Sequence, residues 1–349
     1  MLLDIENLTL HLPGAARPLL ADVSLHVRSG EIVGLVGESG SGKSTTAKAA
    51  LRVLPNGAQA HGRVLVDGAD VLTMSDTRLR GLRSRTVAMV HQDPRSALNP
   101  VRRIGDFLLE RILHTGTKDK RAARRRAVEL LDAVGLSDPE RRIPQYPHEM
   151  SGGMLQRVVI AGALAAEPRL LLADESTSAL DVTTQADILA LLRRLRDERG
   201  LGLLFITHDL HLAATYCDRV HVMYAGRVVE ERQANRLFSH ARHPYTRGLL
   251  DCSPELGETR ELWPIPGRPP SLSESFPGCP FSVRCPHSEP ACDTWRPEPT
   301  PVAGGGTAAC RRLADLPGPS APSDPVPPAA QATHTTQATQ ATQATRSGS

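Results

Sequence analysis

The sequence has no apolar stretch close to the roughly 18 to 20 residues that a helix needs to cross a bilayer. Its first ten residues, MLLDIENLTL, carry acidic side chains where a secretion signal would carry basic ones. A membrane span and a secretion signal are therefore not expected, and we expect the chain to stay in the cytoplasm.

A strong excess of either charge is also missing. The 41 Lys and Arg residues are nearly balanced by 38 Asp and Glu residues, which leaves a formal net charge of +3. This balance gives the surface no general attraction for nucleic acid, so we expect a mixed, solvated surface and no nucleic-acid partner. Hydrophobic residues make up 40% of the chain, which is enough for a core.

The order of apolar runs predicts an α/β fold. From residue 1 to about 90, short apolar runs such as EIVGLVG and TVAMV alternate with turn signals, and TTAKAALRVL has helical spacing. Long helical patterns fill residues 91–165, and two buried-strand patterns, RLLLADE and GLLFITHD, follow with a helical segment between them. Strands that alternate with helices predict a parallel sheet, with an inserted helical subdomain at about 91–165.

The rest of the chain divides into three parts by composition. RVHVMYAGRVVEER predicts a hairpin that turns at Ala225 and Gly226, and we place the end of the first domain (1–240) soon after it. Pro, Gly and Cys dominate residues 241–315, which predicts a small loop-rich module held by something other than an apolar core. Residues 316–349, rich in Pro and then in Gln-Ala-Thr repeats, predict a disordered tail.

A glycine-rich loop predicts a phosphate-binding site. The segment GESGSGKS matches G-x-x-x-x-G-K-S/T between a predicted strand and a predicted helix. The glycines let main-chain N–H groups approach phosphates, Lys43 is expected to reach the β and γ phosphates, and the Ser44 hydroxyl is expected to bind Mg²⁺. The expected ATP-binding residues of the loop are Gly37, Ser39, Gly40, Ser41, Gly42, Lys43, Ser44 and Thr45.

Two later strands are predicted to end in residues suited to ATP hydrolysis. The run LLLA delivers Asp174 and Glu175 at the strand end, where a parallel sheet binds its ligands. Asp174 suits the magnesium shell, and Glu175 suits the base that polarises an attacking water. His208 ends the other strand, where a neutral imidazole can donate a hydrogen bond to a γ-phosphate. Solvated acids and a core histidine remain the alternatives.

Three further motifs complete an ordered series. Gln92 follows TVAMV, Ser151-Gly152-Gly153 precedes a helical pattern, and SALD ends at Asp181. Together with the phosphate loop, the acidic strand end and the histidine, these motifs resemble the nucleotide-binding subunit of an ABC transporter. The resemblance covers roughly residues 30–230 and implies a P-loop NTPase core with antiparallel N-terminal strands.

The resemblance also implies roles for these motifs. Two such domains pair head to tail, so Ser151, Gly152 and Gly153 are expected to contact the ATP of the partner. Gln92 is expected to join Ser44 and Asp174 around Mg²⁺, and Asp181 is expected to belong to the family's D-loop, the SALD loop. The family usually has Leu and Gln on either side of the Ser-Gly-Gly signature, whereas this chain has Met150 and Met154.

Two segments point to one branch of this family. HQDPRSALNPVRRIGDFL and ARHPYTRGLL resemble segments of the importers of oligopeptides, dipeptides and nickel. The resemblance implies a peripheral subunit on the cytoplasmic face of the membrane. Its expected partners are a second, related but different ABC ATPase, two transmembrane permease subunits and, indirectly, an extracytoplasmic solute-binding protein.

Four cysteines, spaced C-x5-C-x6-C-x17-C, are similar to the cysteine module that closes the peptide-permease ATPases; they are Cys279, Cys285, Cys292 and Cys310. Four thiolates can hold Zn²⁺ or a 4Fe–4S cluster. Zinc sites favour C-x2–4-C pairs, and no pair here is that close, so we favour the 4Fe–4S cluster and keep zinc as the alternative. Free or disulfide-paired thiols are less favoured. Cys217 and Cys252 are expected to be packing residues.

We therefore predict an ABC ATPase that powers the import of dipeptides or oligopeptides. Glu175 is the expected general base, and His208 is the expected γ-phosphate switch. An importer of nickel or of another small solute is the alternative. A soluble ABC ATPase without transport is less favoured, because the sequence has one phosphate loop and no sustained heptads.

Overall fold

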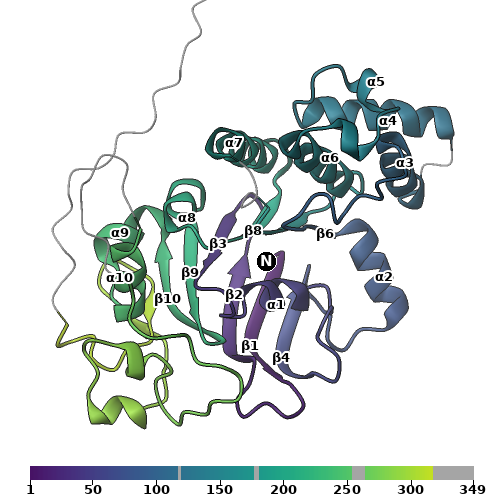
Figure 1. Ribbon diagram of the computed structural model, residues 1–349. Coiled ribbons are helices and arrows are strands. Elements are labelled where there is room, and N and C mark those ends of the chain that lie inside the picture. The colour runs from purple at the N-terminus through teal and green to yellow at the C-terminus, as the bar shows by residue number, and fades with distance from the viewer. Residues whose placement is uncertain (117–118, 177–180, 254–263, 317–349) are drawn as a thin grey trace, which may run out of the picture.

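The computed structural model describes residues 1–116, 119–176, 181–253 and 264–316, which form two β-sheets with helices around them (Figure 1). The predicted tail, apart from Leu316 itself, and residues 178–180 of the SALD segment lie outside the described residues. The predicted α/β class, with a mostly parallel sheet, antiparallel N-terminal strands and an inserted helical subdomain, is confirmed.

The larger sheet has eight strands in the order β11-β12-β10-β9-β3-β8-β7-β6. Its strands are β3 (Ile32–Val36), β6 (Val87–Val90), β7 (Leu170–Asp174), β8 (Gly202–Thr207), β9 (Arg219–Tyr224), β10 (Arg227–Gln233), β11 (Thr300–Pro301) and β12 (Thr307–Ala308). The neighbours from β9 to β6 pair in parallel. Every residue of β3, β7 and β8 is buried, as expected for parallel strands covered on both faces. Their carboxyl ends meet at one edge.

The smaller sheet is antiparallel and has the strand order β2-β1-β4-β5. Its strands are β1 (Leu3–His11), β2 (Leu20–Val27), β4 (Gln59–Val66) and β5 (Ala69–Asp70). The side chains of β3 point alternately to the two faces of the larger sheet, and each face contributes to a separate apolar core. Val33 and Leu35 belong to the core shared with the smaller sheet, whereas Ile32 and Val36 belong to the core shared with the helical subdomain.

The predicted hairpin is present between β9 and β10. Ala225 and Gly226 form its turn with φ of 47° and 83°. A Cβ on Gly226 would lie 2.3 Å from the carbonyl oxygen of Leu19, so only glycine fits at that position.

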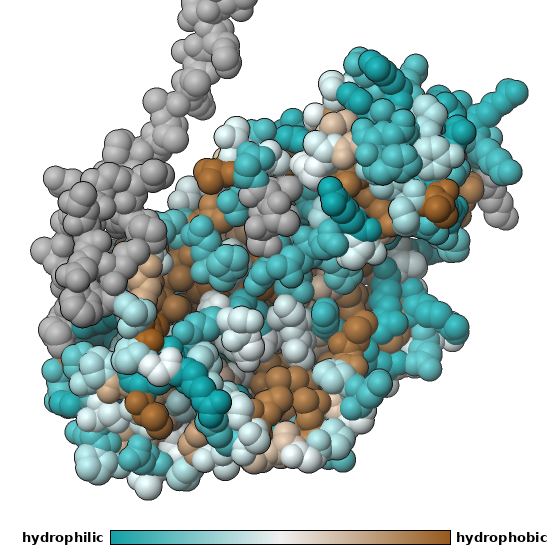
Figure 2. Space-filling view, viewed as in Figure 1, coloured by the Kyte–Doolittle hydropathy of each residue, from teal (hydrophilic) through white to brown (hydrophobic). Residues whose placement is uncertain are grey.

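The helical subdomain lies at one side of the larger sheet (Figure 1). It contains α3 (Ile104–His114), α4 (Lys120–Ala133), α5 (Pro139–Arg142), the 3-10 turn η1 (Pro147–Glu149) and α6 (Gly152–Leu164). In α4, Ala123, Ala127 and Leu130 face the core, while Arg124 and Arg125 are exposed. On the face seen in Figure 2, hydrophilic side chains cover most of this subdomain, and apolar ones appear in smaller groups.

Further helices flank the sheets or connect their strands. They are α1 (Lys43–Ala49), α2 (Asp76–Arg85), α7 (Val182–Arg199), α8 (Leu210–Tyr216), η2 (Ala234–Arg236), α9 (Leu237–His240), α10 (Pro244–Asp251), η3 (Ser282–Arg284) and η4 (Pro290–Asp293). Helix α1 is shorter than TTAKAALRVL predicted, because Arg52 adopts a φ of 49° and its N–H bonds back to the carbonyl of Ala49. No helix within the described ranges has the length and apolarity that a membrane span requires.

The C-terminal part of the chain returns to the larger sheet. Strand β12 pairs antiparallel with β10, with Glu230 opposite Ala308 and Glu231 opposite Thr307. The side chains of Glu230 and Arg232 form a fully buried ion pair beneath this contact, with 2.8 Å between Nε and Oε1. This pairing brings the cysteine-containing segment next to the larger sheet (Figure 1).

Candidate active site

The glycine-rich loop lies between the carboxyl end of β3 and the start of α1. Gly37 has a φ of 147°, and a Cβ there would lie 2.2 Å from the carbonyl oxygen of Met223. Gly42 has a φ of 104°, and a Cβ there would lie 2.6 Å from Cδ2 of Leu20. Neither position accepts a side chain, so the sequence requirement for glycine follows directly from the packing of the loop.

The other loop residues lie where the motif predicts them. Ser39 and Gly40 are exposed at the tip, and Gly40 has a φ of 80°. The buried Ser41 hydroxyl has no hydrogen-bond partner among the described residues. Ser44 and Thr45 lie in the first turn of α1. An orphaned hydroxyl beside a loop that excludes side chains fits a cradle for phosphate oxygens.

Lys43 is held at the base of this loop. Its Nζ donates to the carbonyl oxygens of Gly37 at 2.8 Å and Glu38 at 2.9 Å. Burial lowers the pKa of Lys43, while the nearby carboxylates of Glu175, Asp174 and Glu38 oppose that shift. Two main-chain carbonyls thus hold the ammonium group inside the loop, where the motif places the phosphates.

Ser44 and Asp174 come together across the edge of the sheet. The Ser44 hydroxyl donates to Oδ1 of Asp174 at 2.7 Å. Asp174 is the last residue of β7 and is buried, whereas Ser44 lies in the first turn of α1. A hydroxyl and a carboxylate in contact are the hard oxygen ligands that Mg²⁺ prefers, so the donor set fits that ion.

Two predicted site residues, Gln92 and His208, both lie next to the carboxylate of a third, Glu175. Nε2 of Gln92 donates to Oε2 of Glu175 at 3.0 Å, and Nδ1 of His208 lies 3.8 Å from the same oxygen. The three residues follow the adjacent parallel strands β6, β7 and β8. Glu175 has a φ of 46°, a sparsely populated conformation for a residue with a side chain. Its N–H donates to the carbonyl of Ile206, which holds that conformation in place.

The Ser-Gly-Gly signature begins α6. Ser151 caps this helix by accepting from the N–H of Met154 at 3.3 Å. A Cβ on Gly153 would lie 2.5 Å from Cγ2 of Thr184, so this glycine allows α6 and α7 to approach closely. Asp181 caps α7 by accepting from the N–H of Thr184 at 3.0 Å, and this hydrogen bond lowers the pKa of Asp181.

The structure does not bring all the predicted site residues to one place. The phosphate loop, Asp174, Glu175, Gln92 and His208 gather at the carboxyl edge of the larger sheet. Among the described residues, no hydrogen bond joins Ser151, Gly152 or Gly153 to the phosphate loop of the same chain.

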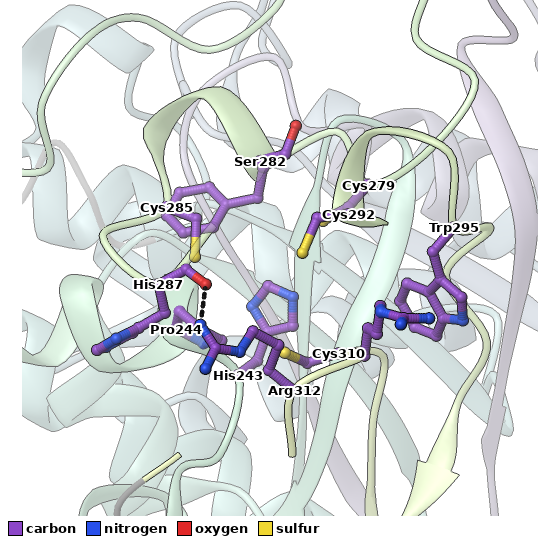
Figure 3. A pocket seen from close by; sticks show the side chains of 12 residues that line it. His243, Pro244, Cys279, Ser282, Cys285, His287, Cys292, Trp295, Cys310 and Arg312 are labelled. Atoms are coloured by element: carbon purple, nitrogen blue, oxygen red, sulfur yellow. Dashed lines mark hydrogen bonds between the residues drawn. The ribbon is translucent and has the colours of Figure 1, made fainter. Parts of the chain in front are cut away.

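The four cysteines line one cavity together with residues that include His243, Phe281 and Trp295 (Figure 3). The sulfur atoms of Cys285, Cys292 and Cys310 point into it, and the N–H of Cys279 donates to the carbonyl of Cys292 at 2.9 Å. All four thiols are free. Within the described ranges, no three His, Cys, Asp or Glu side chains form a group that could hold a single metal ion.

Burial governs the ionisation of the groups around this cavity. It raises the pKa of Cys279 to about 11 and also raises the pKa values of Cys285 and Cys310. It lowers the pKa of His243 to about 3, so this imidazole is neutral. Cys217 lies elsewhere and is buried against Gly34, as predicted for a packing residue.

Sequence reasoning missed contacts between the C-terminal segment and the phosphate loop. The N–H of Glu38 donates to the Tyr245 hydroxyl at 2.9 Å, and the Glu38 carboxylate pairs with Arg284. Tyr245 belongs to ARHPYTRGLL, so that motif was a signal for one partner. Nothing in the sequence pattern indicated Arg284.

A phosphate loop with its lysine, an acidic strand end joined to a glutamine and a histidine, and a Ser-Gly-Gly helix start define an ATP-binding cassette ATPase. The family model for the ABC transporter matches residues 20–178. The model for the C-terminal region of oligopeptide/dipeptide transporters matches residues 229–292. The chain belongs to the ABC transporter ATP-binding proteins of the oligopeptide/dipeptide family.

Individual relatives agree with this assignment. The oligopeptide transport ATP-binding protein OppD of Mycobacterium tuberculosis is 48% identical over 325 residues, which cover 92% of this chain but only 53% of that protein. This chain thus spans about half the length of that relative. The probable peptide ABC transporter ATP-binding protein y4tR of Sinorhizobium fredii is 44% identical over 322 residues, which cover 90% of this chain and 96% of that protein.

A solved structure agrees as well. It is an ATP-binding cassette determined as a dimer in a post-hydrolysis state bound to ADP and Pi, and it is similar with a TM-score of 0.59 and 30% identity. The similarity covers 66% of this chain and 98% of that one.

Proposed function

We propose that this chain hydrolyses ATP to power the import of dipeptides or oligopeptides. The observation that carries the proposal is the meeting of Gln92, Glu175 and His208 at one carboxylate oxygen, beside the Ser44–Asp174 contact and the phosphate loop. Family membership and the names of its relatives support peptides as the cargo. Import of nickel or of another small solute is the alternative, and a non-transport ABC ATPase is less favoured.

The residues divide the chemistry among them. Lys43 and the main-chain N–H groups from Gly37 to Thr45 bind the phosphates and stabilise the charge that develops on them. Ser44, Asp174 and Gln92 hold Mg²⁺, which supplies charge neutralisation when bound. Glu175 accepts a proton from the attacking water, and His208 donates a hydrogen bond to the γ-phosphate.

The signature residues serve the ATP of a partner. Ser151, Gly152 and Gly153 begin a helix, so main-chain N–H groups at that end can bind a phosphate presented by another subunit. Asp181 caps the neighbouring α7, whose Thr184 side chain packs against Gly153. The partners are a second, related ABC ATPase and two transmembrane permease subunits, with an extracytoplasmic solute-binding protein acting indirectly. The chain is peripheral on the cytoplasmic face of the membrane.

The proposed domain plan has a nucleotide-binding domain at 1–240, including the helical subdomain at about 91–165, a cysteine-containing extension at 241–315 and a tail at 316–349. The four cysteines hold a 4Fe–4S cluster that fixes the extension. The shared cavity supports this role (Figure 3). Four thiolates around one zinc ion lie about 3.8 Å apart, given a Zn–S distance of about 2.3 Å. A four-iron cluster is larger than one zinc ion, and four thiolates are a ligand set that it accepts.

The proposed function is tested with Glu175→Gln in the full chain assembled with its membrane subunits. ATP binding is expected to persist, while hydrolysis and peptide uptake fall about 100-fold or more, because the general base is lost. Glu198→Gln makes the same change on the exposed face of α7 and serves as the control. Normal hydrolysis by Glu175→Gln would refute the assignment of the base, and uptake of no peptide by the wild-type complex would refute the cargo.

A further inference from the structure

Glu38, in the phosphate loop, is held by two residues from the C-terminal segment. Its N–H donates to the hydroxyl of Tyr245 at 2.9 Å. Its carboxylate accepts from both terminal nitrogens of Arg284, at 2.7 and 3.0 Å. Its carbonyl oxygen accepts from Lys43 within the loop. The N–H, the carboxylate and the carbonyl of Glu38 are therefore all hydrogen-bonded. The partners of the N–H and of the carboxylate come from outside the loop.

Both outside partners are fixed by packing. The fully buried Tyr245 ring lies 4.6 Å from the ring of Tyr224 and 5.4 Å from that of Phe281, centroid to centroid. The Arg284 side chain is 5% exposed and also donates to the carbonyl of Pro266 at 2.9 Å. A bidentate pair with a buried, preorganised guanidinium is stronger than the flexible pairs on a protein surface.

The charge of Glu38 makes this contact relevant to nucleotide binding. An unpaired carboxylate in this loop would repel a triphosphate and would compete with it for Lys43. The Glu38 carboxylate already acts electrostatically on Lys43. Arg284 pairs with the carboxylate and offsets its charge, while Tyr245 accepts from the main-chain N–H of the same residue.

We propose that Arg284 and Tyr245 are positioning residues of the phosphate loop, through which the C-terminal segment sets the affinity of the chain for ATP. This inference rests on the proposed binding of ATP by the loop. Arg284 ends η3 and directly precedes Cys285, so the segment that holds Glu38 also forms a wall of the four-cysteine cavity.

The test measures the Kd of the full chain for Mg-ATP by calorimetry. Arg284→Ala is expected to weaken binding about fivefold or more, at the low end of the coupling typical of linked sites. Adding Glu38→Gln to Arg284→Ala is expected to restore most of that loss, because the unpaired carboxylate is removed. Tyr245→Phe keeps the ring packing, loses the hydroxyl and is expected to weaken binding by a smaller factor. Arg284→Lys keeps the charge but loses the bidentate geometry, so its Kd is expected to lie between those of wild type and Arg284→Ala.

Arg296→Ala is the matched control, since Arg296 also links the C-terminal segment to the core, through Asp22 at 2.6 Å, but is exposed. Its Kd is expected to equal that of wild type. If Arg284→Ala does not fold, the same comparison is made with Arg284→Lys alone and with Arg284→Lys combined with Glu38→Gln. A wild-type chain that binds no Mg-ATP would overturn the proposed function and this inference with it. A wild type that binds, with Arg284 variants matching Arg296→Ala or unrescued by Glu38→Gln, would overturn this inference alone.

Discussion

Replacing Glu230 by Gln tests how the C-terminal segment is attached to the ATPase core. The Glu230 carboxylate accepts from Nε of Arg232 at 2.8 Å, from the N–H of Arg242 at 2.8 Å and from the N–H of His243 at 2.9 Å. Arg232 in turn donates to the carbonyls of Ala303 at 3.0 Å and Gly305 at 2.6 Å. One buried ion pair thus joins β10, the start of α10 and the loop before β12.

The structure gives the expected size of the effect. The side chains of Glu230 and Arg232 are both 0% exposed, so Gln leaves a buried guanidinium without its counter-charge. Breaking one side of a buried pair costs about 3–5 kcal/mol, and the remaining amide oxygen places this substitution near about 3 kcal/mol. At about 2 °C per kcal/mol for a chain of this size, the melting temperature is expected to fall by about 6 °C.

The assay combines thermal melting with hydrogen exchange over residues 300–309. Exchange in that segment is expected to accelerate, because its carbonyls lose an anchored donor. Glu298→Gln makes the same charge change at an exposed position and controls for net charge. If Glu230→Gln has the same melting temperature as Glu298→Gln, and hydrogen exchange over residues 300–309 is unchanged, the buried ion pair does not hold the segment.

Three further predictions concern the loop, an interior histidine and the cysteines. Gly42→Ala is expected to weaken Mg-ATP binding about tenfold or more, because φ is 104° and Leu20 lies in the way; a Kd within twofold of wild type would contradict this. Burial lowers the pKa of His221 to about 4, so the unfolded chain binds an extra proton between about pH 6.5 and pH 4. The contribution of His221 to the free energy of unfolding should therefore be fully present above pH 6.5. Between pH 6.5 and about pH 4 it should fall by about 1.4 kcal/mol for each pH unit. Denaturant melts at several pH values should show that His221→Asn removes this part of the slope. The proposed 4Fe–4S cluster predicts that the anaerobically purified wild type contains iron and acid-labile sulfide and that Cys292→Ser loses both together. Since Arg284 adjoins Cys285, the same variant is expected to weaken ATP binding. Zinc at one equivalent in the wild type would contradict the cluster.

The sequence predicted features that depend on local patterns. The phosphate loop, the strand ends at Asp174 and His208, and the hairpin turn at Ala225 were predictable because turn chemistry and apolar runs specify them within a few residues. The extent of α1 was not, because Arg52 leaves the helix to donate to carbonyls of another segment, at Val71 and Met74.

Long-range contacts account for the rest. Arg284 and Glu38 are 246 residues apart, and no periodicity relates them. Strand β12 is two residues long, too short to show an alternating pattern, and its position is set by pairing with β10. Tertiary packing, and not local propensity, thus decides where the C-terminal segment lies.

The proposed function requires that this chain bind ATP in its own phosphate loop and depend on a partner's signature helix to hydrolyse it. The most direct measurement compares the rate of ATP hydrolysis per chain for the isolated full chain and for the assembled transporter. The rate is expected to rise by orders of magnitude on assembly, because the partner then supplies the missing phosphate contacts. An isolated chain that hydrolyses ATP at the rate of the complex, independently of its own concentration, would contradict it.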